Sequence, residues 1–198
     1  MKKGIMMPVL AIVLAAAVLF GLSAGFGGIA AANAREDHLN LLKIMSPGSE
    51  NFTLEAYDGE DANIRSVHKG EKGFVIETVT YGYAGEITVY VGVTLEGKVS
   101  GLVVRDLSET YGLGREALTN VEFLSQFLNS AGSFEVATSG ADAFSGATAE
   151  AAPEGDTVAV DALTGATVTS KAVVRCINSA VAYVTGADAT TAATSWGG

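Results

Sequence analysis

An uncharged stretch over residues 4–34 constrains this chain more than any other feature of its sequence. Its first part is almost continuously apolar and exceeds the ~20 residues that a helix needs to cross a bilayer. Because Lys2 and Lys3 precede it, the positive-inside tendency predicts a cytoplasmic N-terminus and an extracytoplasmic domain after Arg35. The sequence therefore predicts a transmembrane anchor over residues 5–33, in a single-pass protein of the cell membrane that has room for one substantial domain.

A cleaved signal peptide is the alternative to this anchor, because Ala30-Ala31-Ala32-Asn33-Ala34 offers small-residue cleavage sites. The apolar stretch is longer than the ~7–15 residues typical of a signal peptide, which favours the anchor. A lipid anchor is disfavoured, because the one cysteine, Cys176, lies far from the N-terminus.

Charge and cysteine content exclude several functions for the exported part. The chain has 12 basic and 22 acidic residues, so without Lys2 and Lys3 the exported part keeps 10 basic and 22 acidic residues, a net charge of −12. Such a surface repels phosphodiester backbones, and we expect no nucleic-acid partner. A single thiol cannot supply the four cysteines of an iron–sulfur cluster, and Cys176 is predicted to be a buried structural thiol. No metal site is expected, because His38 and His68 lie outside the motifs described below.

The remaining chain divides into a stalk, a domain and a tail. A juxtamembrane stalk is predicted over residues 35–52, with a short helix from Leu39 to Met45 that ends before Ser46-Pro47-Gly48. The domain is predicted over residues 53–186, and the low-complexity tail over 187–198 is predicted to be disordered.

Four segments rich in Val, Ile, Thr and Tyr predict an antiparallel meander inside this domain. They are Ala62–Val67, Gly73–Thr80, Glu86–Thr94 and Lys98–Arg105, with a hairpin turn over Leu95–Lys98. A helical pattern with aromatic residues then runs from Glu116 to Leu128 and is predicted to cover the core. Residues 137–157 lack an apolar period and are predicted to be a mobile loop. The predicted fold is α+β, a twisted antiparallel sheet with packed helices, preceded by one N-terminal transmembrane helix.

The run Asp161-Ala162-Leu163-Thr164-Gly165-Ala166-Thr167-Val168-Thr169-Ser170 precedes apolar residues at helical spacing. It predicts a tight Thr-Gly-Ala-Thr turn that leads into a helix of roughly four turns. The first N–H groups of a helix lack internal acceptors and lie at the positive end of its dipole, while Gly165 and Ala166 add no bulk that would block a phosphate. Because Ser and Thr are also common N-caps, the spacing alone leaves an ordinary cap as the alternative.

This run resembles the flavinylation motif of the FMN-binding domain found in the G subunit of the Rnf-type ferredoxin:NAD oxidoreductase and the C subunit of the sodium-translocating NADH:quinone oxidoreductase. The resemblance implies that a flavin transferase joins the phosphate of FMN to the second threonine of the motif, which is Thr167 here. Asp161, Thr164, Gly165 and Ala166 are then expected to belong to the FMN site. Thr167 would be a modification site, and no catalytic nucleophile is expected.

A second segment, Glu109-Thr110-Tyr111-Gly112-Leu113-Gly114, carries the same resemblance. The family usually reads E-T-P-G-L-G in a turn close to the flavin, so the resemblance implies that this segment lies at the FMN site. The residues expected there are Glu109, Thr110, Gly112, Leu113 and Gly114. Tyr111 stands where proline is usual, which leaves the turn less rigid but keeps both glycines.

A copy of the first motif, Asp142-Ala143-Phe144-Ser145-Gly146-Ala147-Thr148, ends nineteen residues before Thr167. Thr148 is predicted to remain unmodified, because Pro153 and Gly155 would end any following helix within two turns. Nearby acidic residues would also oppose a phosphate at this position.

Together the two motifs imply an electron-carrier subunit of an ion-translocating oxidoreductase of the Rnf type, with covalent FMN as its cofactor. Its expected partners are the other membrane subunits of the complex and, during maturation, a flavin transferase. One alternative is a stand-alone, membrane-tethered flavoprotein that transfers electrons outside the cell. A second is an exported binding module without a cofactor.

Overall fold

The computed structural model describes residues 32–107, 118–137, 157–163 and 165–186. Most of the predicted anchor, the E-T-Y-G-L-G segment, Thr148, Thr164 and the predicted tail lie outside these residues. Contacts between backbone positions divide the chain into two units, Met1–Leu41 and Leu42–Gly198. Residues 32–45 are helical, and the helical run ends before Ser46-Pro47-Gly48 as predicted. Within the described parts of the chain, no helix combines the length and the apolar composition needed to cross a membrane.

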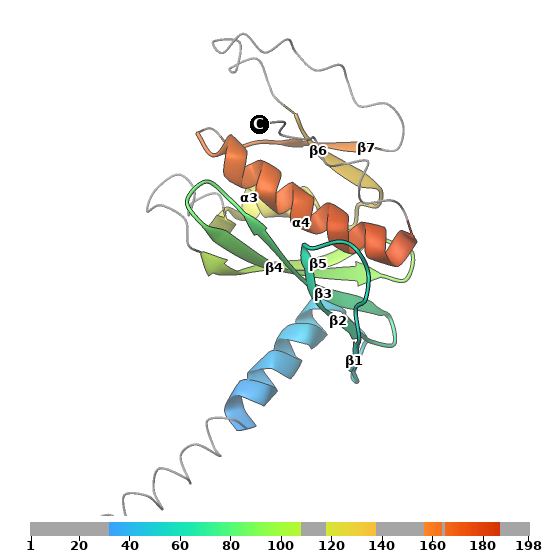
Figure 1. The fold of residues 1–198 in the computed structure, drawn as a ribbon. Coiled ribbons are helices and arrows are strands. Elements are labelled where there is room, and N and C mark those ends of the chain that lie inside the picture. The colour runs from blue at the N-terminus through green and yellow to red at the C-terminus, as the bar shows by residue number, and fades with distance from the viewer. Residues whose placement is uncertain (1–31, 108–117, 138–156, 164, 187–198) are drawn as a thin grey trace, which may run out of the picture. The chain divides into compact units, whose positions relative to one another are not determined.

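Five strands form an antiparallel meander in which each strand pairs with the next one along the chain (Figure 1). They are β1 (Thr53–Glu55), β2 (Ile64–Lys69), β3 (Gly73–Tyr81), β4 (Glu86–Thr94) and β5 (Val99–Leu107). The predicted antiparallel meander is therefore confirmed, and β1 is a further strand at its edge. Alternation along β4 places Ile87, Val89 and Val91 on the face that forms the core, where each is fully buried.

The β4–β5 connection is the tight turn that the sequence predicts. Thr94 donates its N–H to the carbonyl oxygen of Lys98 at 2.8 Å, and Gly97 donates to the carbonyl oxygen of Thr94 at 3.0 Å. Gly97 has φ +80°, a conformation that glycine adopts without steric cost.

The predicted helical pattern from 116 to 128 is interrupted at Asn120, which is a correction to the sequence analysis. The Asn120 side chain accepts the N–H of Phe123 at 3.0 Å and so caps a separate short helix, α3 (Val121–Ser125). Residues 126–129 form a turn. The predicted packing role of the aromatic residues is confirmed, since Phe123 and Phe127 are buried with ring centroids 5.3 Å apart.

A parallel pair of strands, absent from the sequence prediction, lies outside the meander. β6 (Ser133–Ala137) pairs with β7 (Thr157–Asp161), so that Ser133 faces Thr157 and Ala137 faces Asp161. The α+β class with an antiparallel main sheet is confirmed, and this two-stranded sheet is an addition to it.

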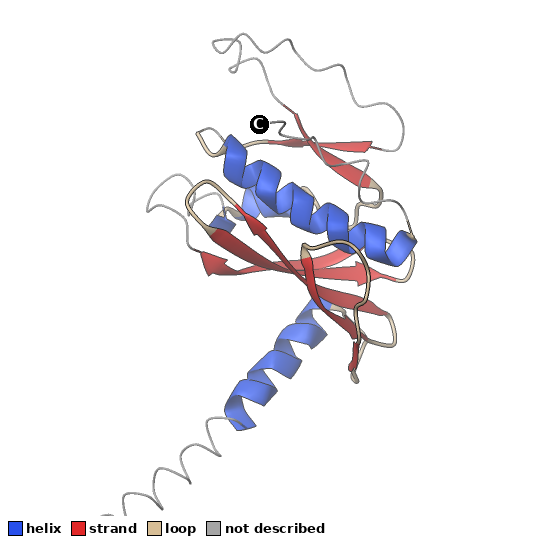
Figure 2. Cartoon of the chain, viewed as in Figure 1, coloured by secondary structure: helices blue, strands red, loops and turns tan. Residues whose placement is uncertain are grey.

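The long helix α4 (Thr167–Thr185) lies between the two sheets (Figure 2). It packs against β3 and β4 on one side and against β6 on the other. This position explains why α4 is buried around most of its circumference beyond its second turn, including the polar residues Asn178 and Ser179. The helix that Thr167 begins is therefore held from both sides by the rest of the domain.

Candidate functional site

The start of α4 is the tight turn that the sequence predicts. Gly165 has φ +78°, and Ala166 donates its N–H to the carbonyl oxygen of Leu163 at 2.9 Å. The left-handed conformation explains the glycine, because side chains with a Cβ rarely adopt it. Thr167 is the first residue of the helix and is half-buried, whereas Val168 after it is half exposed.

Two side chains fix the backbone that leads into this turn. The Gln126 side chain accepts the N–H of Asp161 at 2.8 Å and donates to the carbonyl oxygen of the same residue at 3.4 Å. The buried hydroxyl of Ser170 accepts the N–H of Leu163 at 3.3 Å. The end of β7 is thereby tied to the residue that follows α3, and the turn is tied to the helix that it starts.

The electrostatics of this helix start favour an anion. The first turn of α4 contains no acidic residue, and Ala166 at the N-cap has no side-chain oxygen to accept from the first N–H groups. These N–H groups lie at the positive end of the helix dipole. Lys171, exposed one turn after Thr167, adds a positive charge. The described donors therefore fit a phosphate group attached to the Thr167 hydroxyl.

The first half of α4 lies over the end of the sheet at which β3 and β5 end. Arg175 donates from Nη1 to the Oγ1 atom of Thr80 at 3.2 Å, which places the first half of α4 over the end of β3. In the sheet Thr80 faces Ile87, and Ile87 faces Leu107, the last residue of β5. Figure 1 shows the start of α4 and the β3–β4 hairpin at one end of the sheet.

The segment with the second motif begins at Glu109, two residues after Leu107. The first half of α4, which begins at Thr167, thus lies over the end of the sheet at which β5 ends. The residues that the sequence analysis assigned to the second motif, Glu109, Thr110, Gly112, Leu113 and Gly114, lie outside the described residues, as does Thr164.

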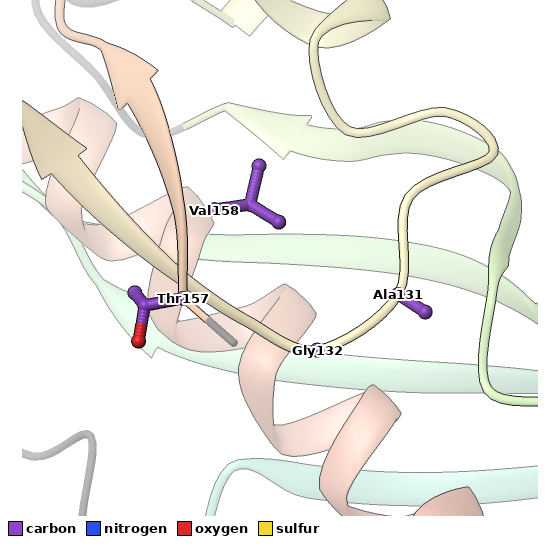
Figure 3. A pocket seen from close by; sticks show the side chains of 4 residues that line it. All are labelled: Ala131, Gly132, Thr157 and Val158. Atoms are coloured by element: carbon purple, nitrogen blue, oxygen red, sulfur yellow. The ribbon is translucent and has the colours of Figure 1, made fainter. Parts of the chain in front are cut away.

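A surface hollow elsewhere on the domain does not belong to this site. It is lined by Ala131, Gly132, Thr157 and Val158 (Figure 3). These residues lie at the beginning of β6 and β7, whereas Thr167 follows the opposite end of β7. None of the four side chains carries a charge with which to hold a phosphate.

Cys176 is a buried free thiol inside α4. Burial raises the pKa of its thiol from 9.0 to about 11, and a hydrogen bond with Thr78 and the charge of Arg175 oppose this shift only in part. The thiol is therefore protonated at neutral pH and is not nucleophilic. The prediction of a buried structural thiol is confirmed.

The sequence analysis missed two residues that position the site. One is Gln126, and the other is Asn178, whose side chain accepts the N–H of Phe134 and donates to its carbonyl oxygen, both at 2.8 Å. Asn178 offers a weak signal, as a carboxamide in the mostly apolar run from Cys176 to Val184. Gln126 carries no comparable signal, because it follows α3 in a polar turn.

A model of the FMN-binding domain family matches residues 82–182. The match runs from the β3–β4 hairpin into the last turn of α4 and includes the segments of both motifs.

Two relatives are similar over part of their length. The G subunit of the Na⁺-translocating ferredoxin:NAD⁺ oxidoreductase complex of Acetobacterium woodii is 32% identical over 110 residues, which cover 55% of this chain and 47% of that protein. The G subunit of the proton-translocating ferredoxin:NAD⁺ oxidoreductase complex of Clostridium ljungdahlii is 34% identical over 122 residues, which cover 61% of this chain and 58% of that protein. The chain thus spans about half the length of these relatives.

A solved structure, that of NqrC from Shewanella oneidensis, aligns with a TM-score of 0.46 at 20% sequence identity. The alignment covers 77% of this chain and 74% of that one.

Proposed function

The chain belongs to the FMN-binding domain family, as its two motifs predicted, and we propose a function from this membership. The chain is the electron-carrier subunit of an ion-translocating complex of the Rnf type. In this proposal FMN is esterified through its phosphate to Thr167. The names of the two relatives, both G subunits of ferredoxin:NAD⁺ oxidoreductase complexes, support the assignment. When bound, FMN supplies the one- and two-electron redox chemistry, and the protein supplies its binding and orientation.

The observation that carries the proposal is the position of Thr167 as the first residue of α4. Its hydroxyl stands beside backbone N–H groups at the positive end of a helix whose first turn has no carboxylate. Gly165 is exposed in a left-handed conformation, and it has no side chain that would obstruct a phosphate on Thr167.

The residues around this turn hold the attachment point in place. Gln126 fixes Asp161, Ser170 fixes Leu163, and the remainder of α4 is packed between the two sheets. A phosphate on Thr167 is thereby attached to a rigid element, which keeps a tethered flavin at one end of the sheet.

Attachment requires a donor with an activated phosphate, such as a flavin phosphoanhydride. The bond between the phosphorus atom and the Thr167 oxygen forms as the anhydride bond breaks, and the leaving group takes the electron pair and the hydroxyl proton. This phosphoryl transfer leaves the oxidation state of the flavin unchanged. A flavin transferase is the partner that would catalyse it.

Location in the membrane and contact with other subunits belong to the same proposal. The uncharged stretch over residues 5–33 supports a single-pass anchor, with the FMN domain on the extracytoplasmic face. A stand-alone flavoprotein remains the alternative, because the family match covers the flavin domain and names no neighbouring subunit.

The test uses the full chain, co-expressed with a flavin transferase and then denatured and washed. We expect flavin fluorescence to stay with the protein and peptide mass mapping to place the FMN mass on Thr167. Thr167→Ala should abolish it with little loss of stability, because Thr167 is half-buried and is not the N-cap of α4. Thr148→Ala, in the other copy of this motif, serves as the matched control and should retain it. An FMN mass on Thr148, or on neither threonine, would refute the attachment site. Co-purification with complex subunits from native membranes distinguishes the complex from the stand-alone carrier.

A further inference from the structure

The charges of α4 differ from those of the rest of the exported chain. The helix contains two basic residues, Lys171 and Arg175, and no aspartate or glutamate, although the exported chain is strongly acidic. The ion pairs of the described residues use Lys43, Arg65 and Lys69. Within this described part, Arg175 donates to the neutral hydroxyl of Thr80, and neither basic residue of α4 has a carboxylate partner.

These two basic residues continue the face of the helix on which Thr167 lies. Lys171 and Arg175 follow Thr167 at intervals of four residues, so the three side chains form one row along α4. Both basic side chains are exposed, whereas the next turns of α4 are buried between the sheets. The row therefore begins at the attachment site and ends where the helix enters the core.

The spacing of this row suits the two negative groups of an attached flavin. Neighbouring positions in the row have Cβ atoms ~5–6 Å apart, which a lysine side chain spans easily. A phosphodiester on Thr167 retains one negative charge, and the flavin ring gains a second when it is fully reduced at neutral pH. The ribityl chain separates the ring from the phosphate, and Arg175 lies about 12 Å along the helix from Thr167.

We propose that Lys171 and Arg175 form an electrostatic cradle for the covalent flavin, in which Lys171 pairs with the phosphate on Thr167 and Arg175 stabilises the reduced ring. This inference rests on the proposed attachment of FMN to Thr167. Both residues act by position and charge, and neither is a catalytic residue. Thr80 contributes by holding the Arg175 guanidinium over the end of β3.

The test compares Lys171→Gln and Arg175→Gln with a matched control, Lys72→Gln. Lys72 is also exposed, and it precedes β3 at the end of the strand opposite to Thr80, so the control removes the same charge away from the site. The conservative variants Lys171→Arg and Arg175→Lys preserve each charge. For every full-length protein, the initial rate of flavin attachment is followed by intact mass at a fixed transferase concentration, and the midpoint potential of the attached flavin is measured at low and high salt.

We expect Lys171→Gln to slow attachment roughly threefold to fivefold, which is the size of an exposed charge contact, and Lys171→Arg to restore the rate. Arg175→Gln should shift the midpoint potential to a more negative value, because the reduced ring loses a favourable charge, and Arg175→Lys should reverse most of the shift. Both effects should shrink at high salt, and Lys72→Gln should show neither.

If wild-type protein carries FMN on Thr167 while both glutamine variants match it in rate and potential, the cradle is refuted and the attachment site stands. If wild-type protein carries no FMN on Thr167, the proposed function fails as well.

Discussion

Asn178 and Gln126 act in the same way on the two strands of the parallel pair. Each carboxamide accepts a backbone N–H and donates to the carbonyl oxygen of the same residue, Phe134 in β6 and Asp161 at the end of β7. A side-chain amide thus replaces the hydrogen bonds that a further strand would make. The Asn178 contact is buried, so its loss would leave two backbone groups without partners.

Replacing Asn178 with alanine should therefore cost about 2–4 kcal/mol of unfolding free energy, which urea denaturation would measure. Asn63→Ala provides a comparison, because the Asn63 side chain makes one part-buried hydrogen bond, to Ser179 on α4. Its loss should cost about 1 kcal/mol or less. Equal losses of unfolding free energy in the two variants would show that the buried hydrogen bonds with Phe134 stabilise the fold no more than the single bond of Asn63 does.

Hydrogen bonds to the Glu71 carboxylate make part of the folding stability depend on acidic pH. Its carboxylate accepts from the side-chain amide of Asn51 at 2.9 Å and from the backbone N–H of Glu50 at 3.0 Å. These hydrogen bonds, the one from the Asn51 side chain foremost, lower the Glu71 pKa from 4.5 to about 2. A lowered folded pKa means stability that is present above 4.5 and is lost as the pH falls towards 2.

NMR titration should accordingly give a Glu71 pKa well below the ordinary value of 4.5, and Asn51→Ala should raise it. In Glu71→Gln the contribution of this residue to the pH dependence of unfolding between 4.5 and 2 should disappear. A normal Glu71 pKa in the wild-type protein would mean that the carboxylate does not hold the 50–51 backbone in solution.

The residues of the site differ in how far the sequence predicts them. The turn at Gly165 and the helix start at Thr167 could be predicted because both are determined by neighbouring residues, whereas the role expected of Thr167 came from the resemblance. Gln126 could not, because its partner Asp161 is 35 residues away, and Asn178 is 44 residues from Phe134. Only the fold brings such pairs together.

A similar distinction holds for the elements. Each strand of the meander pairs with its neighbour in the chain through a short turn, so alternation and turn residues predict it. The parallel strands β6 and β7 are five residues each and are joined through a long connection, which leaves no local sign of pairing. The interruption before α3 depends on one capping side chain, Asn120, inside a pattern that otherwise continues.

At the scale of elements, a pair of glycines in the large sheet leaves space for Met45, the last residue of the helical run over residues 32–45. Gly92 in β4 faces Gly101 in β5, and Met45 packs against both. Ser100 also donates its hydroxyl to the carbonyl oxygen of Met45 at 2.6 Å. A Cβ on Gly92 would collide with that carbonyl oxygen, whereas a Cβ on Gly101 would meet Met45 atoms at 3.0–3.1 Å.

Gly92→Ala should thus destabilise the domain by about 1–3 kcal/mol, as expected for overpacking against backbone, and should increase protease cleavage near Met45. Gly101→Ala should cost less, because its Cβ would come no nearer than 3.0 Å to the Met45 Cα, and the flexible Sδ and Cε atoms of Met45 can move away. Wild-type stability and cleavage in Gly92→Ala would show that the contact with Met45 does not hold the segment in solution.

At the scale of the domain that begins at Leu42, α4 is the shared core of two sheets. Val173 and Ile177 in α4 belong to one buried cluster with Val91 of the large sheet and Val160 of the small sheet. Neither sheet can leave α4 without exposing this cluster to water, so both should unfold in one cooperative step.

Native-state hydrogen exchange measures this coupling directly. Backbone amides in the middle of β6 and β7, such as that of Val160, should exchange with the same free energy of opening as Val91 in β4, because both report global unfolding. In Asn178→Ala the small sheet loses its buried polar link to α4, so its amides should open at lower free energy than those of β4. If the β7 amides already exchange far more readily than Val91 in the wild-type protein, β6 and β7 form a separate unfolding unit. The turn that carries Thr167 would then open with them, because it follows β7 directly.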